Sequence, residues 1–233
     1  MNEMLSDIIN WAYSPEYERR RQECIDALFS PENRREETCE NLGGKFSRWK
    51  CRYEGVVGGY HRAGCENKIF WCNDIIFTYQ SIDENGDFCT LLTHPNARRY
   101  LFFKFDLFGY GVLDIDSKET FYYFPAPEVE DGETFIWTEA HFHPSRPLLA
   151  VGGCYWGAPY DVFLYEMENP LCPFTRQGSV HQALDKVYEC YTHVDFIRWE
   201  EDALILRCEG FEDDCKTEEI RMLYADDYLS ILK

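Results

Sequence analysis

The stretch FIWTEAHFHPSRPLLAVGGCYWGAPYDVFLYE, residues 135–166, contains three apolar runs separated by turn residues. Phe135–Phe142 is rich in aromatic residues, Leu148–Val151 is continuously apolar, and Asp161–Glu166 ends before an Asn-Pro pair. Short apolar runs bounded by Gly, Pro and Asn are typical of β-strands, and a continuous run indicates a strand buried on both faces. We therefore expect three strands here, and strands of similar length recur along the chain.

Residues 1–44 are expected to form an N-terminal helical segment, folded as a hairpin. Ser14-Pro15-Glu16 and Ser30-Pro31-Glu32 both combine a Ser N-cap, a Pro at the first helical position and an acid in the first turn. The first helix is predicted to run from Pro15 to Phe29 and the second from Pro31 to Leu42. Gly43-Gly44 would end the second helix as a left-handed cap.

Residues 45–233 are expected to form one β-rich domain. A glycine-rich loop is predicted over 55–64, an Asn-Gly hairpin turn over 83–87 and an exposed linker over 125–134. Ser179 and Gln182 form a capping box that predicts one further helix, ending near Tyr191. Besides the three strands of the central stretch, we predict strands at Phe46–Tyr53, Lys68–Cys72, Ile75–Ser81, Phe88–Thr93, Arg99–Phe105, Val112–Ile115, Glu119–Phe124, Val194–Trp199, Ala203–Cys208 and Glu218–Tyr224.

An internal repeat links the central stretch to the segment before it. The His-Pro pair at His143 has a counterpart 49 residues earlier at His94, and each pair precedes two apolar runs. Residues 196–228 follow the same plan more loosely. Repeats of this length, each holding several short strands, are typical of propeller blades.

Residues 142–166 resemble a blade of the WD-repeat or related β-propeller family. The matching residues are Phe142-His143-Pro144, Leu148-Leu149-Ala150, Gly152-Gly153 and Asp161–Glu166, which ends in Tyr165-Glu166 where the family has Trp-Asp. The resemblance implies a binding platform, since most propellers serve as one, although a fold does not fix a function. A closed propeller needs at least four blades, so curved antiparallel sheet repeats are the alternative. The expected fold class is thus mainly β, with propeller-like or curved antiparallel β-sheet repeats, an N-terminal helical hairpin and one further helix.

The composition limits the partners and the compartment. The chain of 233 residues has a net charge of −19, which repels nucleic acids and anionic membranes. This charge suits a basic protein partner, or it serves only to keep an aromatic-rich protein in solution, which is the simpler interpretation. No apolar run is long enough to cross a membrane, and Glu3 and Asp7 stand where a secretory signal needs positive charge. The 11 cysteines are odd in number, which argues against a complete disulfide framework. We expect a cytoplasmic protein with reduced thiols.

Two sets of residues are candidates for a functional site. His141 and His143 lie two residues apart on a predicted strand, on the same face as Glu139, and could bind a divalent metal in a hydrolase. The simpler interpretation is that His143 belongs to the His-Pro turn and His141 is a hydrogen-bonded strand residue. No phosphate-binding loop and no nucleophile elbow occurs, so no catalytic residue and no cofactor is predicted.

The favoured hypothesis is a non-enzymatic protein-binding module, which could neutralise or block a basic partner. Aromatic anchors inside a rim of acids suit such a surface. A purely structural domain of a larger assembly is a further alternative, and the sequence does not specify an oligomeric state. The predicted surface consists of the aromatic residues Tyr155, Trp156 and Tyr160 with the acids Glu128, Glu130, Asp131 and Asp161.

Overall fold

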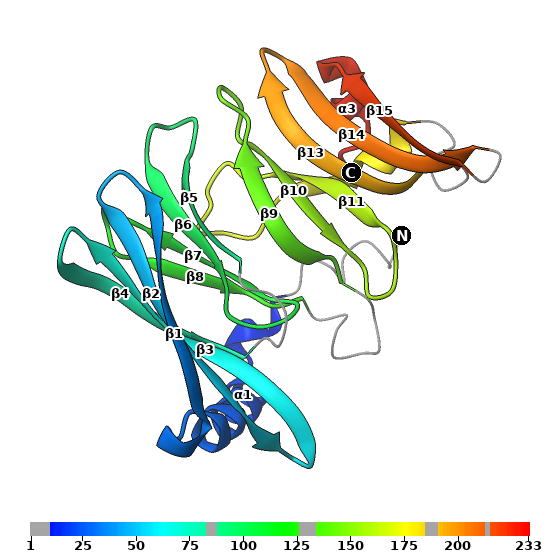
Figure 1. Cartoon of the computed structure of the whole chain (residues 1–233). Coiled ribbons are helices and arrows are strands. Elements are labelled where there is room, and N and C mark those ends of the chain that lie inside the picture. The colour runs from blue at the N-terminus through cyan, green and yellow to red at the C-terminus, as the bar shows by residue number, and fades with distance from the viewer. Residues whose placement is uncertain (1–9, 83–87, 126–133, 185–190, 213–214) are drawn as a thin grey trace. The chain divides into compact units, whose positions relative to one another are not determined.

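A computed structural model describes residues 10–82, 88–125, 134–184, 191–212 and 215–233. The chain divides into two units, one comprising Met1–Leu91, Leu101–Gly111 and Tyr122–Ala126, the other Leu92–Tyr100, Val112–Phe121 and Pro127–Lys233. The described residues form three β-sheets and few helices (Figure 1), which confirms the prediction of a mainly β protein. Among them, no helix combines the length and the apolar character that a membrane crossing requires.

The first unit contains a four-stranded antiparallel sheet covered by one helix. Its strands β1 (Arg34–Gly43), β2 (Phe46–Val57), β3 (Tyr60–Trp71) and β4 (Asp74–Ser81) pair in chain order. The helix α1 (Pro15–Leu28) begins at the predicted cap, where the Ser14 side chain accepts a hydrogen bond from the Tyr17 N–H. Leu28 of α1 is buried against Cys51 and Tyr53 of β2. The first predicted helix is therefore confirmed.

The second predicted helix, Pro31–Leu42, is wrong. Ser30-Pro31 starts only a 3₁₀ turn over Pro31–Asn33, in which the Ser30 side chain makes no capping hydrogen bond, and β1 follows. The segment is almost wholly polar, so a helix there would have had no apolar face to bury. Gly44, at φ +59°, and Lys45 instead form the turn that joins β1 to β2, and Gly43, the last residue of β1, has φ +109°. The same positive-φ glycines that can end a helix can therefore turn a hairpin.

The predicted loop over residues 55–64 is also replaced by a hairpin. β2 and β3 pair without a break from Phe46↔Trp71 to Val57↔Tyr60, and Gly58-Gly59 provide the positive-φ turn. A second four-stranded sheet follows, with the order β5 (Cys89–Thr93), β6 (Arg99–Lys104), β7 (Tyr110–Asp114) and β8 (Thr120–Tyr123). The strands of this sheet are divided between the two units.

The central stretch forms the expected three strands. β9 (Ile136–Phe142), β10 (Leu148–Cys154) and β11 (Tyr160–Glu166) pair antiparallel, and β10 is buried along almost all its length. A short strand β12 (Arg176–Ser179) pairs with β11, and β13 (Tyr191–Glu200), β14 (Ala203–Glu212) and β15 (Cys215–Leu223) form an antiparallel ribbon. β11 and β13 are joined by one parallel residue pair, Tyr160↔His193. Backbone pairing at this junction is thus minimal.

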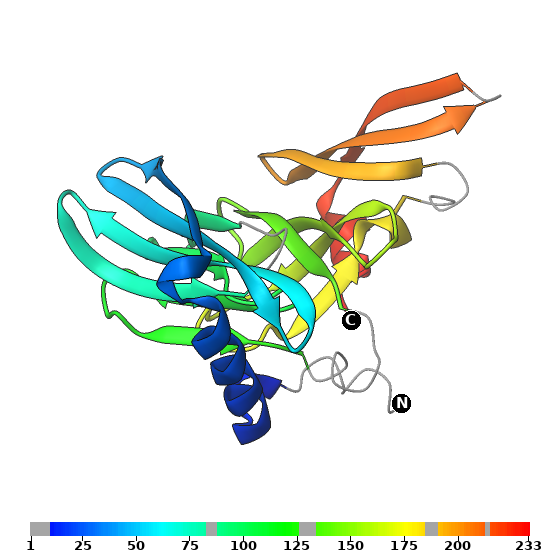
Figure 2. The same ribbon diagram turned by 60° about the horizontal axis from the view of Figure 1, so that its bottom comes forward.

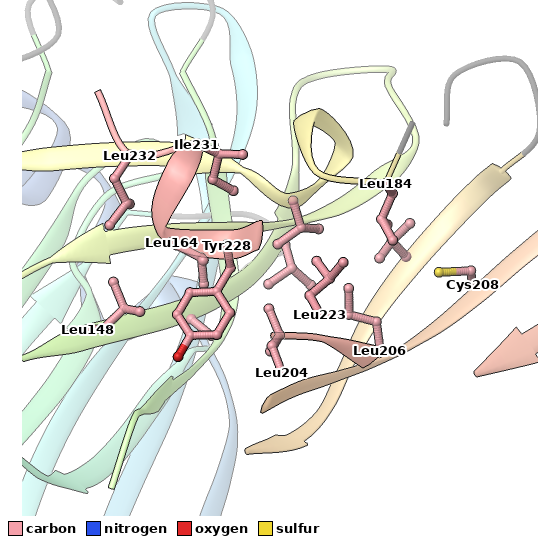
Figure 3. Packing of buried hydrophobic residues seen from close by; sticks show 14 residues of the cluster. Leu148, Leu164, Leu184, Leu204, Leu206, Cys208, Leu223, Tyr228, Ile231 and Leu232 are labelled. Atoms are coloured by element: carbon pink, nitrogen blue, oxygen red, sulfur yellow. The ribbon is translucent and has the colours of Figure 1, made fainter. Parts of the chain in front are cut away.

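Apolar packing holds the two sets of strands of the second unit together (Figure 3). Leu148 and Leu164 of β10 and β11 share one cluster with Leu204, Leu206 and other side chains of β13–β15. The C-terminal helix α3 (Ala225–Ser230), which the sequence analysis did not predict, adds the fully buried Tyr228 to this cluster. Ile231 and Leu232 follow α3 and are also buried there.

Two further predictions concern the segment between β12 and β13. Ser179 caps a 3₁₀ turn over Val180–Gln182 by accepting a hydrogen bond from the His181 N–H. The rest of the predicted helix includes residues 185–190, which lie outside the described residues, as do the predicted hairpin turn 83–87 and most of the linker 125–134. The remaining predicted strands are confirmed with shifts of a few residues at most ends, whereas β3 begins eight residues before the predicted Lys68.

We predict that Tyr228→Ala lowers the free energy of unfolding by about 3 to 5 kcal/mol, because truncating a buried aromatic side chain removes its packing and leaves a cavity. Urea unfolding followed by tryptophan fluorescence measures this loss. The matched control is Tyr224→Ala, four residues earlier and 61% exposed, which should cost less than about 1 kcal/mol. Equal losses in the two variants would contradict the assignment of Tyr228 to the core.

Candidate protein-binding surface

The loop between β10 and β11 places Trp156 at the corner of a tight turn. The carbonyl of Tyr155 accepts a hydrogen bond from the Ala158 N–H at 3.0 Å, and Gly157 has φ +74°. A turn with a positive φ at its third residue requires Gly or a similarly permissive residue there. Because Trp156 precedes that glycine at the corner, its side chain points outward and is 64% exposed.

Tyr155 anchors this turn rather than extending from it. Its half-buried ring packs edge-on against Phe135 at 5.5 Å and Phe163 at 5.8 Å between ring centroids. The turn that presents Trp156 is therefore fixed to the β9–β11 sheet by an aromatic contact. The prediction placed Tyr155 in the binding surface, whereas the structure gives it mainly a supporting position.

Tyr160 lies beside a second ring at the junction of β11 and β13. It is 38% exposed and stacks on His193, with 4.7 Å between centroids and 28° between planes. The His193 Nε2 atom lies 2.8 Å from Asp195 Oδ1, and Asp195 Oδ2 accepts a hydrogen bond of 2.6 Å from Arg207. This chain of contacts fixes the orientation of the imidazole and makes a flat, partly exposed aromatic pair with a carboxylate beside it.

A second acid extends this surface. Glu209 faces His193 across the β13–β14 pairing and makes an ion pair of 2.7 Å with Lys216. The hydrogen bond from Lys216 lowers the pKa of Glu209 from its ordinary value. The residues Trp156, Tyr160, His193, Asp195 and Glu209 are called the aromatic-acidic surface below.

The sequence analysis placed Asp161 among the exposed acids of the rim, but the residue is buried in the interior. It is 5% exposed, accepts a hydrogen bond of 2.5 Å from the Ser179 hydroxyl and another of 2.6 Å from the Val162 N–H. Burial raises the pKa of Asp161 to about 7, against the opposing effect of these two hydrogen bonds. His181 Nε2 lies 3.7 Å from its carboxylate, and burial lowers the pKa of His181 to about 4. The carboxyl thus joins β11 to the turn after β12.

The other predicted rim acids, Glu128, Glu130 and Asp131, lie outside the described residues.

His143 takes part in the turn between β9 and β10. Its Nδ1 atom accepts hydrogen bonds from the Ser145 and Arg146 N–H groups, both at 3.1 Å, and its side chain is fully buried. The Nε2 atom lies 3.5 Å from Asp202 in the β13–β14 turn. Burial, with a smaller effect of Arg146, lowers the pKa of His143, so the neutral imidazole is favoured. This is the turn interpretation that the sequence analysis considered.

The same turn geometry occurs at the other end of the internal repeat. His94 is buried, and its Nδ1 atom accepts a hydrogen bond of 3.2 Å from the Asn96 N–H. The two histidines therefore stabilise equivalent turns ahead of β6 and β10.

His141 and His143 do not share a metal site in this geometry. The His141 ring stacks on Phe196 at 4.2 Å, and its Nε2 atom lies 3.2 Å from Glu139. Among the described residues, no three His, Cys, Asp or Glu side chains are grouped so that they could hold a metal ion. The nitrogen of His143 that would bind a metal from the turn side, Nδ1, is already used by two backbone donors.

No protein-family model matches the sequence, and no curated protein matches it. One solved structure with partial similarity to this chain is the Pyrococcus horikoshii acylaminoacyl peptidase in an orthorhombic crystal form. The two chains have 8% sequence identity and superpose with a TM-score of 0.41. That match covers 79% of this chain and 32% of the peptidase chain, so this chain spans about a third of the length of that protein.

Sequence reasoning missed His193 and Asp195 as parts of the surface. They are separated from Tyr160 by more than thirty residues and belong to no motif. The single parallel bridge Tyr160↔His193 brings them together. The only local signal was the alternation of His193 and Asp195, which places both on one face of a strand.

We predict that Asp161 makes the protein less stable as the pH rises. Its folded pKa of about 7 exceeds the ordinary value of 3.8, so the folded state binds more protons between these values and loses stability with increasing pH. Asp161→Asn removes this titration. The difference in free energy of unfolding, wild type minus variant, should fall by on the order of 2 to 4 kcal/mol between pH 4 and pH 8.

Chemical denaturation at a series of pH values tests this prediction. His181 has the opposite effect on the free energy of unfolding, because its pKa is lowered and stability is lost as the pH falls from 6.5 towards 4. His181 is present in both proteins, so its contribution largely cancels in the difference. A flat difference for Asp161→Asn would show that the carboxyl is ionised in the folded protein.

Proposed function

We propose that this protein is a non-enzymatic protein-binding module that uses the aromatic-acidic surface. The observation that carries the proposal is the exposed Trp156, held on a turn that Tyr155 fixes to the sheet. Interface hot spots are enriched in Trp and Tyr, and a side chain presented from a rigid base loses little conformational entropy on binding. An exposed indole on a fixed turn therefore suits an anchor for a partner.

The charge favours a basic partner. The chain carries a net charge of −19, and Asp195 and Glu209 stand beside the Tyr160–His193 pair. Complementary charge raises association rates and disfavours acidic competitors. Glu128, Glu130 and Asp131 are included in the proposed rim on the basis of the sequence. Binding of this kind could block the functional surface of a basic protein.

The proposal extends to the fold type and the compartment. We interpret the repeated sheets as propeller-like, because the buried His94 and His143 turns are equivalent. A cytoplasmic location agrees with the free thiols of Cys24, Cys39, Cys51, Cys72, Cys172, Cys208 and Cys215. The hydrolase alternative is less favoured, because His143 is committed to its turn. In a purely structural domain the exposed Trp156 would have no function, whereas in a binding module it would contact the partner.

We predict that Trp156→Ala weakens binding to the basic partner about 30-fold or more, the loss expected for a hot spot of at least 2 kcal/mol. Affinity capture identifies the partner, and isothermal titration calorimetry then measures its dissociation constant for each variant. Tyr160→Ala should weaken binding as well, and the dissociation constant of the wild type should rise with salt concentration.

Tyr60→Ala is the matched control, since Tyr60 is 70% exposed at the start of β3 in the other unit. Its affinity should equal that of the wild type. Unchanged affinity in Trp156→Ala combined with Tyr160→Ala would reject the aromatic-acidic surface as the binding site.

A further inference from the structure

β15 is an open edge of the seven-stranded sheet of the second unit. It stands at the end of the strand order and, within the described residues, pairs with β14 alone (Figures 1 and 2). Every residue from Cys215 to Met222 is exposed or half-buried. Ile220 is 59% exposed and Met222 is 45% exposed. An edge strand of this length, without proline and with exposed apolar side chains, is a template for pairing with another strand.

We propose that β15 pairs with β15 of a second copy of this chain, antiparallel about a two-fold axis at Ile220. Identical strands form a closed dimer when one patch complements itself. The two-fold axis of such an antiparallel pair stands perpendicular to the sheet and passes between one residue and its own copy. The choice of that central residue sets the whole register.

The charges of β15 exclude four of its nine residues as the central residue. An axis at Lys216, Glu218, Glu219 or Arg221 would place two identical charges directly opposite each other, which destabilises a pair of strands. An axis at Thr217 would pair only Cys215–Glu219 of the two β15 strands, and an axis at Met222 would pair only Arg221–Leu223, both shorter overlaps than an axis at Ile220 allows. Ile220 remains, and it allows pairing from Thr217 to Leu223 in both copies.

This register is complementary on both sides of the axis. Ile220 faces the partner's Ile220, Glu219 faces the partner's Arg221, and by symmetry Arg221 faces the partner's Glu219. Glu219 and Arg221 lie 3.4 Å apart within one strand, with side chains 47% and 43% exposed, so both point to the same face and are accessible. Glu218 would face Met222, so no like charges meet directly. The pairing contributes one apolar contact and two ion pairs in addition to the backbone hydrogen bonds.

Sedimentation velocity on the full chain tests the proposal over concentrations from about 1 µM to 1 mM, the range relevant to a small interface. We expect a concentration-dependent dimer in the wild type. Ile220→Lys should remain monomeric, because it places two ammonium groups on the axis. Val56→Lys, at a position 59% exposed in β2, is the matched control and should dimerise as the wild type does.

A charge exchange tests the register without removing the edge. Glu219→Arg alone and Arg221→Glu alone should each weaken dimerisation at least about fivefold, because each puts like charges opposite. The double variant E219R/R221E restores opposite charges in both pairs and should recover the wild-type dimerisation constant. Each variant is first checked for a wild-type unfolding midpoint, so that loss of dimer is not loss of fold.

Disulfide formation gives an independent measurement of the register. Directly opposed residues of antiparallel strands have Cα atoms roughly 4.5 to 5.5 Å apart, within the range of a disulfide. Ile220→Cys should therefore cross-link two chains under mild oxidation, whereas Met222→Cys, which faces Glu218, should cross-link no more than the wild type. A monomer at 1 mM, a dimer that persists in Ile220→Lys, or a failure of the double variant to recover dimerisation would each overturn the proposal.

Discussion

The burial of Tyr228 between the two sets of strands is the contact on which the second unit depends. β11 and β13 share a single backbone pair, so hydrogen bonding cannot hold the β13–β15 ribbon against β9–β11. Tyr228, Ile231 and Leu232 close the apolar cluster, and Lys233 exchanges backbone hydrogen bonds with Gln177 of β12. Apolar burial is not directional, so it joins two sheets that no regular ladder connects. The last residues of the chain thereby connect strands that are distant in sequence.

A chain of aromatic contacts links Tyr228 to the β9–β10 and β13–β14 turns. Tyr228 packs edge-on against Trp199 at 5.5 Å, and Trp199 packs edge-on against His143 at 4.8 Å. His143 faces Asp202 of the β13–β14 turn, which also accepts hydrogen bonds from Arg146. These contacts tie the β9–β10 turn to the β13–β14 turn. They hold the C-terminal end of β13, the strand whose His193 pairs with Tyr160 near the opposite end.

The strands were predictable because their signals are local. Apolar runs bounded by turn residues located most strands, including β10, whose continuous apolar run predicted burial on both faces. The second N-terminal helix was mispredicted because Ser-Pro-Glu and Gly-Gly occur both at helix ends and in β-turns. Pairing with β2 stabilises the segment as the strand β1. Asp161 was placed on the surface because an acid is usually exposed, while Ser179, eighteen residues later, supplies its buried hydrogen bond. The helix α3 was missed because six residues are too few for a periodic pattern. The errors at the second helix and at Asp161 share one cause, a contact made with residues outside the stretch from which the prediction was drawn.

The aromatic-acidic surface and the β15 edge belong to one sheet face, which gives the two proposals a joint consequence. Asp195 of the surface lies opposite Arg207 of β14, and Arg207 lies opposite Ile220 of β15. Pairing of two β15 strands would therefore continue this row across the two-fold axis and carry two aromatic-acidic surfaces on one continuous sheet. A partner with two basic sites, or two partner molecules held in one array, would then contact both surfaces. The second contact would form at an effective concentration set by the fixed spacing of the two surfaces. A weak single contact at Trp156 could in that case support tight binding, because the second contact forms without a further loss of translational freedom.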